Sequence, residues 1–284
     1  MSEPKTIWTR IGRIDRRAII WMLIITTFLA GIFPIQFPIS VSEPTIRSYQ
    51  AVDGLKPNSL VLIAVDFDAG MFASVGYQGV AIIRHLMQKE ARIVFVSSYT
   101  SNAPGLTIMM EKQANIDSKY KYGVNYVNLG FVPGAETFVA AIAKDFRANV
   151  KTDVDGTPID NLPALQGVKD AGSFSLVIDL TSSECVPWWA RQWSIPYGVP
   201  LVAGATGATV TGVMPYYPNK GVVGYLNDVA GGGEYEALLK SPGEATRVLG
   251  MQNIAHMWWF FWMALGNIAL VAETKFSRKN GSGK

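Results

Sequence analysis

Residues 59–67 read Ser-Leu-Val-Leu-Ile-Ala-Val-Asp-Phe, and this run decides the fold. Its apolar residues do not alternate with polar ones, which is typical of a strand covered on both faces in a parallel sheet. Residues 92–98, Arg-Ile-Val-Phe-Val-Ser-Ser, repeat the pattern. Similar runs predict three more buried strands, over 124–129, 173–180 and 199–204.

Helical patterns separate these strands. Residues 71–90, 105–120 and 135–146 carry apolar side chains at helical spacing, and a helix is expected to start near Pro187. Strands that alternate with helices require right-handed crossovers. We therefore expect a doubly wound, mostly parallel α/β sheet of Rossmann or flavodoxin type within residues 43–249.

Other parts of this domain give weaker signals. Residues 149–161 are polar and rich in turn residues, so they predict a surface loop. The pattern over 209–229 fits neither a helix nor a strand clearly. The three glycines at 231–233 are interpreted as a flexible junction before a helix over 234–240.

Two apolar runs flank the domain, at residues 18–39 and 254–272. Neither contains Asp, Glu, Lys or Arg, and soluble core helices rarely stay uncharged for so long. A membrane-spanning helix needs about 20 such residues, so both runs are predicted to be transmembrane helices rather than buried core helices. No small-x-small cleavage site follows the first run, which favours a retained signal anchor.

Basic residues on the outer side of each run predict the topology. Lysine and arginine accumulate on the cytoplasmic flanks of membrane spans. We therefore expect residues 1–17 and 273–284 to be cytoplasmic, the domain to be extracytoplasmic or periplasmic, and the protein to lie in the cytoplasmic (inner) membrane. Residues 5–17 are expected to lie along the membrane surface. The basic residues are Lys5, Arg10, Arg13, Arg16, Arg17, Lys275, Arg278, Lys279 and Lys284.

Composition excludes several classes of function. The net charge is +3 and most of the basic excess lies in the tails, so no nucleic-acid partner is expected. The single cysteine, Cys185, excludes an internal disulfide, and its neighbour Glu184 disfavours a reactive thiolate. The chain has two histidines, His85 and His256, which argues against a Ser-His-Asp triad or a histidine-rich zinc site.

Acidic and hydroxyl residues follow the predicted strands, where ligands bind in open α/β sheets. Carboxylates favour Mg²⁺ or Ca²⁺, so the sequence offers Asp66, Asp68, Asp179 and Glu184 as candidate metal ligands, with no cofactor as the leading expectation. In the alternative interpretation these residues cap helices and satisfy loop amides. The candidate ligand-binding residues at this edge are Ser97, Ser98, Asn128, Thr181 and Ser182.

Two short stretches carry a family resemblance. Val65-Asp66-Phe67-Asp68 and Val96-Ser97 resemble the first two motifs of the haloacid-dehalogenase-like phosphohydrolases. The resemblance implies that Asp66 is a nucleophile and Asp68 a general acid/base. The chain departs from the family at Gly70, where Thr or Val is expected, and echoes the later acidic motif only loosely in Asp179 and Glu184.

The remaining candidates concern contacts with partners. Trp188, Trp189 and Trp193 form either a partner surface or part of the core, and Gly266 and Asn267 favour close contact between helices. The leading hypothesis is a membrane-anchored, non-catalytic subunit or scaffold that contacts the bilayer and other membrane subunits or a second copy. The alternatives are a metal-dependent hydrolase using Asp66, Asp68 and Asp179, and a small-ligand receptor.

Overall fold

A computed structural model describes residues 14–33 and 37–281 of the chain. It divides into two units. One, Pro38–Thr246, is the α/β domain; the other joins residues Met1–Phe37 to Arg247–Lys284.

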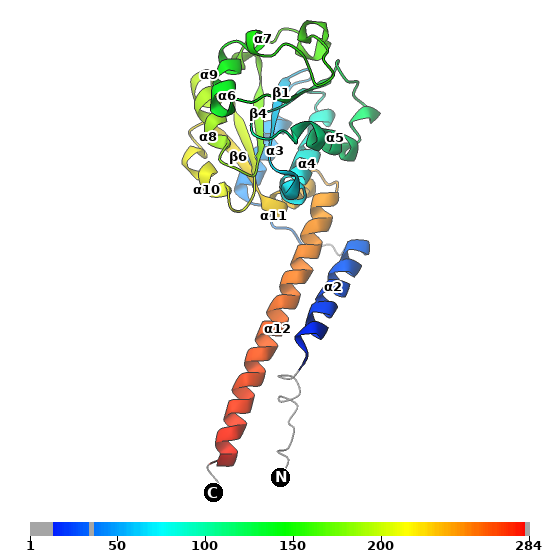
Figure 1. Cartoon of the computed structure of the whole chain (residues 1–284), viewed down its shortest axis with the longest axis vertical. Helices are drawn as coiled ribbons and strands as arrows, with labels where there is room; N and C mark the ends of the chain where they lie inside the picture. The colour runs from blue at the N-terminus through cyan, green and yellow to red at the C-terminus, as the bar shows by residue number, and fades with distance from the viewer. Residues whose placement is uncertain (1–13, 34–36, 282–284) are drawn as a thin grey trace. The chain divides into compact units, whose positions relative to one another are not determined.

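The α/β unit is built on one parallel sheet of six strands (Figure 1). The spatial order is β3-β2-β1-β4-β5-β6, the order of Rossmann-type sheets. The first three strands extend the sheet from β1 to one side, and the last three extend it to the other side, so the strand order reverses between β1 and β4. The expected parallel α/β fold is therefore confirmed. The strands are β1 Leu60–Asp66, β2 Arg92–Ser97, β3 Tyr126–Phe131, β4 Leu176–Thr181, β5 Leu201–Ala205 and β6 Val222–Asn227.

Helices cover both faces of the sheet, and a hydrophobic core lies on each side. In β1, Leu60, Leu62 and Ala64 enter one core, while Val61, Ile63 and Val65 enter the other. One core is closed by α6 Ala135–Lys144, α8 Val186–Trp189 and α10 Val210–Val213, and the other by α3 Glu43–Asp53, α4 Tyr77–Gln88, α5 Ala103–Ala114 and α11 Asp228–Leu238.

Short helical segments complete this unit. The α-helical ones are α7 Phe146–Asn149 and α9 Ile195–Tyr197. Two segments have π-helical hydrogen bonding, Phe72–Gly76 before α4 and Ala190–Ser194 after α8. The 3-10 turns are Ala69–Met71, Ile116–Ser118, Ile159–Asn161, Pro163–Leu165, Ala171–Ser173 and Met214–Tyr216.

The sixth strand lies in the region that the sequence left open. β6 is the last strand of the sheet, and buried residues alternate with half-exposed ones along it. Its residues, Val-Val-Gly-Tyr-Leu-Asn, include a glycine and end in asparagine, two residue types that are depleted in strands. Helix α3 packs against it so closely that a Cβ at Gly224 would lie 2.5 Å from Ser48 Oγ.

The expected flexible junction at glycines 231–233 is wrong. These residues lie inside α11 and are buried. A Cβ at Gly231 would lie 2.8 Å from the Leu226 backbone, and one at Gly232 would lie 2.9 Å from the Ala245 Cβ. The glycines allow α11 to approach its neighbours, which a flexible linker would not require.

The second unit contains α2 Arg16–Ile32 and most of α12 Glu244–Gly281. Among the described residues, one helix is long and apolar enough to cross a membrane, the stretch Glu244–Thr274 of α12. The expectation of two such helices is therefore corrected. The 17 residues of α2 rise only about 26 Å, less than the roughly 30 Å of hydrocarbon. Residues 34–36 and most of 5–17 lie outside the described part.

Candidate functional site

The carboxyl ends of β1 and β4 lie side by side at the point where the strand order of the sheet reverses. Asp66 ends β1, and its backbone pairs in register with Thr181 at the end of β4. The segment after β1 leads to α4 on one face of the sheet, and the segment after β4 leads to α8 on the other. Ligands of open α/β sheets bind at such a point.

Asp66 is wholly buried, and both of its carboxylate oxygens accept hydrogen bonds. Oδ1 accepts from Ser97 Oγ at 2.8 Å and from the Ser98 backbone N–H at 3.2 Å. Oδ2 accepts from Trp189 Nε1 at 3.0 Å. Burial raises the pKa of Asp66, and these three donors oppose that effect. The side chain therefore ties β1, the loop after β2 and helix α8 together.

Asp179 lies one strand away and has no such partners. Its backbone pairs with Ala64 of β1, its side chain is wholly buried, and neither carboxylate oxygen has a hydrogen-bond partner. Burial raises the pKa of Asp179 well above its usual value, and the negative charge of Asp66 raises it further. Asp66 has donors that stabilise its ionised form and Asp179 has none, so Asp179 is the carboxyl of this pair that favours the protonated form.

Cys185 lies in the same enclosed region and is unsuited to nucleophilic chemistry. Its side chain is wholly buried. Burial raises the pKa of the thiol, and the charges of Asp179 and Asp66 raise it further. The reactive thiolate form is therefore disfavoured.

The outer side of this edge carries polar groups that reach solvent. Asp68 is exposed, its backbone N–H donates to Ser182 Oγ at 3.0 Å, and Tyr99 Oη donates to its Oδ2 at 3.2 Å. Glu184 is exposed as well, whereas Asp66 and Asp179 are sealed. Among residues 14–33 and 37–281, no three His, Cys, Asp or Glu side chains form a group that could hold a metal ion.

The predicted ligand-binding hydroxyls and amide make hydrogen bonds within the fold. Ser98 Oγ donates to the Ala135 carbonyl at 3.0 Å, and Asn128 Oδ1 accepts from the Gly130 N–H at 2.9 Å. Thr181 Oγ1 donates to the Asp66 carbonyl at 3.1 Å or to the Ser183 carbonyl at 3.0 Å. These contacts are the kind that the loop-satisfying interpretation expected.

Two of the three tryptophans belong to the core. Trp189 and Trp193 are wholly buried, with ring centroids 5.4 Å apart. Trp193 Nε1 donates to the Val139 carbonyl at 2.9 Å. Trp188 is half-buried. In this fold, Trp189 and Trp193 offer no surface to a partner, because the sheet and α6 already cover them.

Sequence reasoning missed a second pair of acids, on α11. Glu236 is buried, and its carboxylate accepts from the backbone N–H groups of Gly243, Ala245 and Thr246 and from the Thr246 hydroxyl, at 2.6–3.3 Å. These donors form the first turn of α12 and the residue before it, where helix N–H groups lack intrahelical partners. Two residues earlier, Glu234 Oε2 accepts from Ser42 N at 3.0 Å and from Ser42 Oγ at 2.5 Å.

This pair had a weak sequence signal. Glu236 precedes the Ser-Pro-Gly sequence that leads into α12, so it is a possible cap of that helix. Its carboxylate lies on α11, however, and only the folded chain brings it to the start of α12. Helix α11 thus holds the segment that enters the α/β unit and the segment that leaves it.

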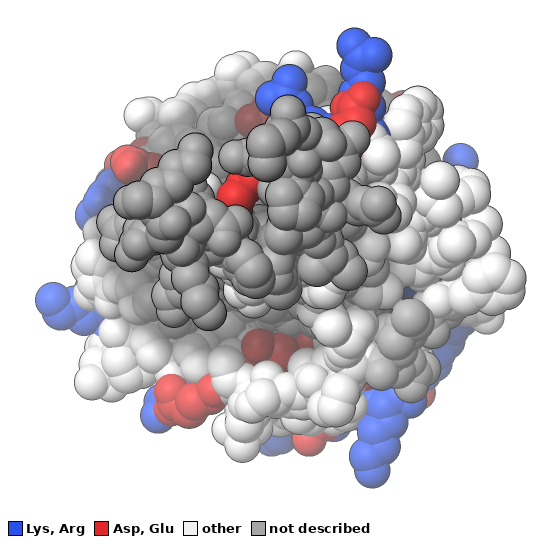
Figure 2. Space-filling model, turned by 90° about the horizontal axis from the view of Figure 1, so that it is seen from below, with Lys and Arg blue, Asp and Glu red and all other residues white. Residues whose placement is uncertain are grey.

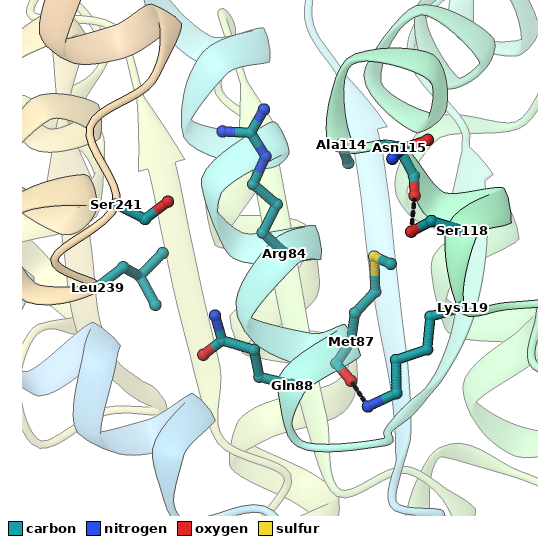
Figure 3. Close-up of a pocket in the computed structure, with 9 residues that line it drawn as sticks. All are labelled: Arg84, Met87, Gln88, Ala114, Asn115, Ser118, Lys119, Leu239 and Ser241. Carbon is teal, nitrogen blue, oxygen red and sulfur yellow. Dashed lines mark hydrogen bonds between the residues drawn. The ribbon is translucent and has the colours of Figure 1, made fainter.

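The structure also has surface grooves away from the sheet edge. One, of about 290 Å³, lies between α4, the end of α5 and the segment after α11 (Figure 3). Its two cationic side chains already donate to backbone carbonyls, Arg84 Nη2 to Gln113 at 2.8 Å and Lys119 Nζ to Met87 at 2.9 Å. The groove therefore has no uncommitted cation that would attract an anion.

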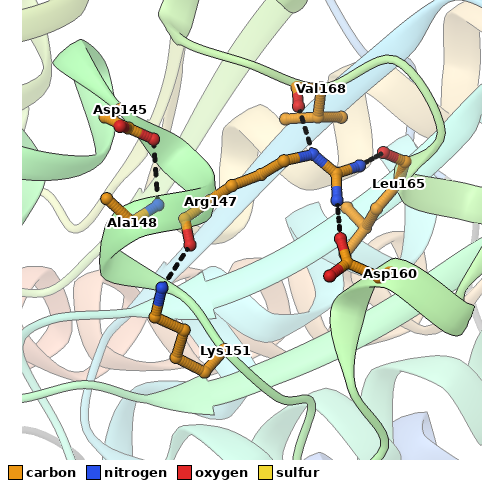
Figure 4. A network of polar contacts seen from close by, with 7 residues as sticks. All are labelled: Asp145, Arg147, Ala148, Lys151, Asp160, Leu165 and Val168. Carbon is orange, nitrogen blue, oxygen red and sulfur yellow. Dashed lines mark hydrogen bonds and ion pairs between the residues drawn. The ribbon is translucent and has the colours of Figure 1, made fainter.

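Arg147 also donates hydrogen bonds to backbone carbonyls of the fold. Its Nε donates to the Val168 carbonyl at 2.8 Å and its Nη2 to the Leu165 carbonyl at 2.7 Å, while Nη1 pairs with Asp160 (Figure 4). The guanidinium fixes the irregular segment that precedes β4. This arginine is therefore part of the fold.

Charged side chains of both signs lie on the face of the molecule shown in Figure 2. Lys and Arg side chains stand around its rim among Asp and Glu, and the visible described residues form no patch of a single sign. A nucleic-acid interface would instead gather basic residues on one face.

No protein-family model matches the chain, and no curated protein matches it.

Proposed function

We propose that this chain is a membrane-anchored, non-catalytic subunit or scaffold of a membrane protein assembly, in which the α/β unit makes protein contacts. The strongest support is that two acidic side chains at the carboxyl edge of the sheet are buried, whereas many apolar side chains of α12 are exposed. The acids that would perform chemistry, Asp66 and Asp179, are sealed in the fold. In the most apolar stretch of α12, only 6% of the residues are buried.

The proposed anchoring uses both ends of the chain. Ile20, Trp21 and Phe28 of α2 are 48%, 63% and 66% exposed, so this helix has an apolar surface that water would not favour. The basic residues outside the two segments place both tails on the cytoplasmic side in this proposal.

The proposed partners are the bilayer and either other membrane subunits or a second copy of the chain. A nucleic acid is not among them, because the basic excess lies in tails that would adjoin anionic lipid headgroups.

The test is the mass and composition of the affinity-tagged full chain, extracted in mild detergent from its native membrane. A particle larger than one chain, with partners or further copies at fixed stoichiometry, is the expected result. A monomer without a partner would refute the proposal. Protease added to sealed vesicles tests the topology, because the tails should be protected from one side and the α/β unit from the other.

A small-ligand receptor is the second candidate, and the position of Asp68 favours it. This exposed carboxylate, with Tyr99 and Ser182 beside it, lies at the edge of the sheet where the strand order reverses. A receptor predicts that a ligand raises the melting temperature of the full chain without being converted. Asp68→Asn should reduce that shift, and Asp145→Asn, on a distant helix cap, should leave it unchanged.

The metal-dependent hydrolase is less compatible with this geometry. It requires Asp66 as a ligand or nucleophile, but both of its oxygens are occupied by protein donors and the side chain has no access to solvent. Stabilisation of the full chain by Mg²⁺ or Ca²⁺ that disappears in Asp68→Asn would revive this alternative.

A further inference from the structure

Helix α12 carries two stripes of residues at the spacing of a helix–helix contact. One stripe, which we name the covered seam, advances in alternating steps of four and three residues, the period of coiled-coil packing. Its members are half-buried or buried within their own unit, and at its start Met251 Sδ lies 3.2 Å from the Cβ position of Gly31 on α2. The covered seam consists of Met251, Ala255, Trp258, Trp262, Leu265 and Ala269.

The second stripe has the same period and is one of several on α12 that no described residue covers. We name it the open seam, and all of its residues are exposed, Phe260 and Leu270 to 61%. At 3.6 residues per turn, positions 7, 11 and 18 residues apart lie within about 20° of one another around the helix. The open seam consists of His256, Phe260, Met263, Asn267, Leu270 and Thr274.

The polar residues of the apolar stretch fall on the open seam. Apart from tryptophan, residues 254–272 contain two side chains that form strong hydrogen bonds, His256 and Asn267, and both belong to this stripe. Neither has a hydrogen-bond partner in the described part of the chain. Polar side chains within a bilayer are rare and face protein partners, because hydrocarbon cannot satisfy them. The open seam is therefore a protein-facing surface if α12 crosses the membrane, as the proposed function holds.

We propose that the open seam binds the open seam of a second copy of this chain. All copies insert in the same direction, so two α12 helices pair in parallel, and a two-fold axis places each residue opposite its own equivalent. An asparagine amide both donates and accepts, and so does a neutral imidazole, so Asn267 and His256 can each satisfy the same residue of the second copy. A groove of about 540 Å³ beside His256, lined by Leu23, Ala255, Trp259 and Phe260, accommodates an apolar side chain of that copy.

Cysteine cross-linking in native membranes tests this directly. The native Cys185 is wholly buried and outside α12, so it gives no background. Single cysteines at each position from 255 to 270 of the full chain would be oxidised, and disulfide-linked dimers measured on a non-reducing gel. Dimer yield should peak at 256, 260, 263, 267 and 270 and be lowest at 258, 262, 265 and 269. A profile without this period, or with peaks on the covered seam, overturns the proposal.

A substitution measures the contribution of the amide. Asn267→Leu should weaken dimerisation in detergent roughly three- to twenty-fold, the range of measured interhelical hydrogen bonds. The matched control, Ile268→Leu, lies off the seam and should leave dimerisation unchanged. Equal effects of the two variants would contradict the pairing of Asn267.

The outcome separates this inference from the function on which it rests. If other proteins co-purify but no α12 cross-link forms, the second copy is wrong and the subunit function stands. If alkaline carbonate releases the chain from membranes, both fail.

Discussion

The carboxyl edge of the sheet and helix α11 both bury acidic side chains, and they use them for different purposes. At the sheet edge, Asp66 holds three donors from different elements, while the neighbouring Asp179 holds none. On α11, Glu236 holds four donors at the start of α12, and Glu234 holds Ser42. A buried carboxylate is thus evidence of a site only after its partners have been counted.

The comparison also separates two kinds of buried acid. Some hold neighbouring segments together through hydrogen bonds, and one is buried at a cost in free energy that no hydrogen bond offsets. A carboxylate with enough donors recovers the free energy it loses when it leaves water, and one without donors becomes protonated instead. Asp66 and Glu236 each have several donors, and Asp179 has none. The variants below test this division.

The largest expected effect belongs to Asp66→Ala. It leaves the Ser97 hydroxyl, the Ser98 N–H and the Trp189 N–H without an acceptor in the core, which should lower the free energy of unfolding by about 3–5 kcal/mol. Denaturant unfolding of the full chain in mild detergent measures it. The control, Asp68→Ala, removes an exposed carboxylate and should change stability by less than about 1 kcal/mol. Equal losses would show that Asp66 does not organise this edge.

The next effect is that of Glu236→Gln. The amide keeps one acceptor oxygen but removes the charge that binds the N–H groups of Gly243 and Thr246, at a cost of about 1–3 kcal/mol. Hydrogen exchange should accelerate at residues 243–246 and stay unchanged in β1. Uniform acceleration across the sheet would mean that the carboxylate stabilises the whole unit, not the start of α12.

The variant Asp179→Asn tests the acid without hydrogen-bond partners, through the pH dependence of the free energy of unfolding. The folded-state pKa of Asp179 lies above its unfolded value near 3.8, so the folded protein holds a proton that the unfolded chain releases. The stability from this proton is complete below about pH 4 and is lost as pH rises through the folded-state pKa, at no more than about 1.4 kcal/mol per pH unit. Wild-type unfolding free energy should therefore fall with rising pH, and the variant should lose that slope.

Two other carboxyls, Asp66 and Glu111, have raised pKa values and contribute in the same direction, and Glu111 needs a control. Burial, with a smaller effect of the Asp117 charge, raises the pKa of Glu111 to about 7. Its stabilising proton is lost as pH rises through about 7, so the pH dependence from Glu111 overlaps with that from Asp179. The double variant with Glu111→Gln separates the two. An unchanged slope in Asp179→Asn would show that Asp179 is ionised in the fold.

The smallest expected effect is that of Glu234→Gln. Its bonds to Ser42 are exposed to solvent, so their loss should cost less than about 1 kcal/mol. Faster hydrogen exchange at the start of α3, with α12 unaffected, is the expected sign. A loss as large as that of Glu236→Gln would remove the distinction between the two glutamates.

The sequence predicted those parts of the fold that leave a local pattern. The central strand at residues 60–66 is buried on both faces, so nearly every residue along it is apolar and the run is visible in the sequence. The edge strand at 222–227 is buried on alternate residues only and was missed. Asp66 and Asp179 were found because they end or interrupt buried strands, but no local pattern distinguishes three donors from none. The capping role of Glu236 depends on residues seven to ten positions away, brought to it by the turn after α11.

The two glutamates of α11 also determine how tension would travel through the chain. Ser42 and Thr246, the points where the polypeptide enters and leaves the α/β unit, are held two residues apart on the same helix. A pull applied between the segment before Ser42 and the segment after Thr246 would load α11 and its carboxylates before it reached any strand. Forced unfolding from residues 38 and 246 should therefore begin with release of these contacts, and the sheet should keep its hydrogen bonds until they have broken.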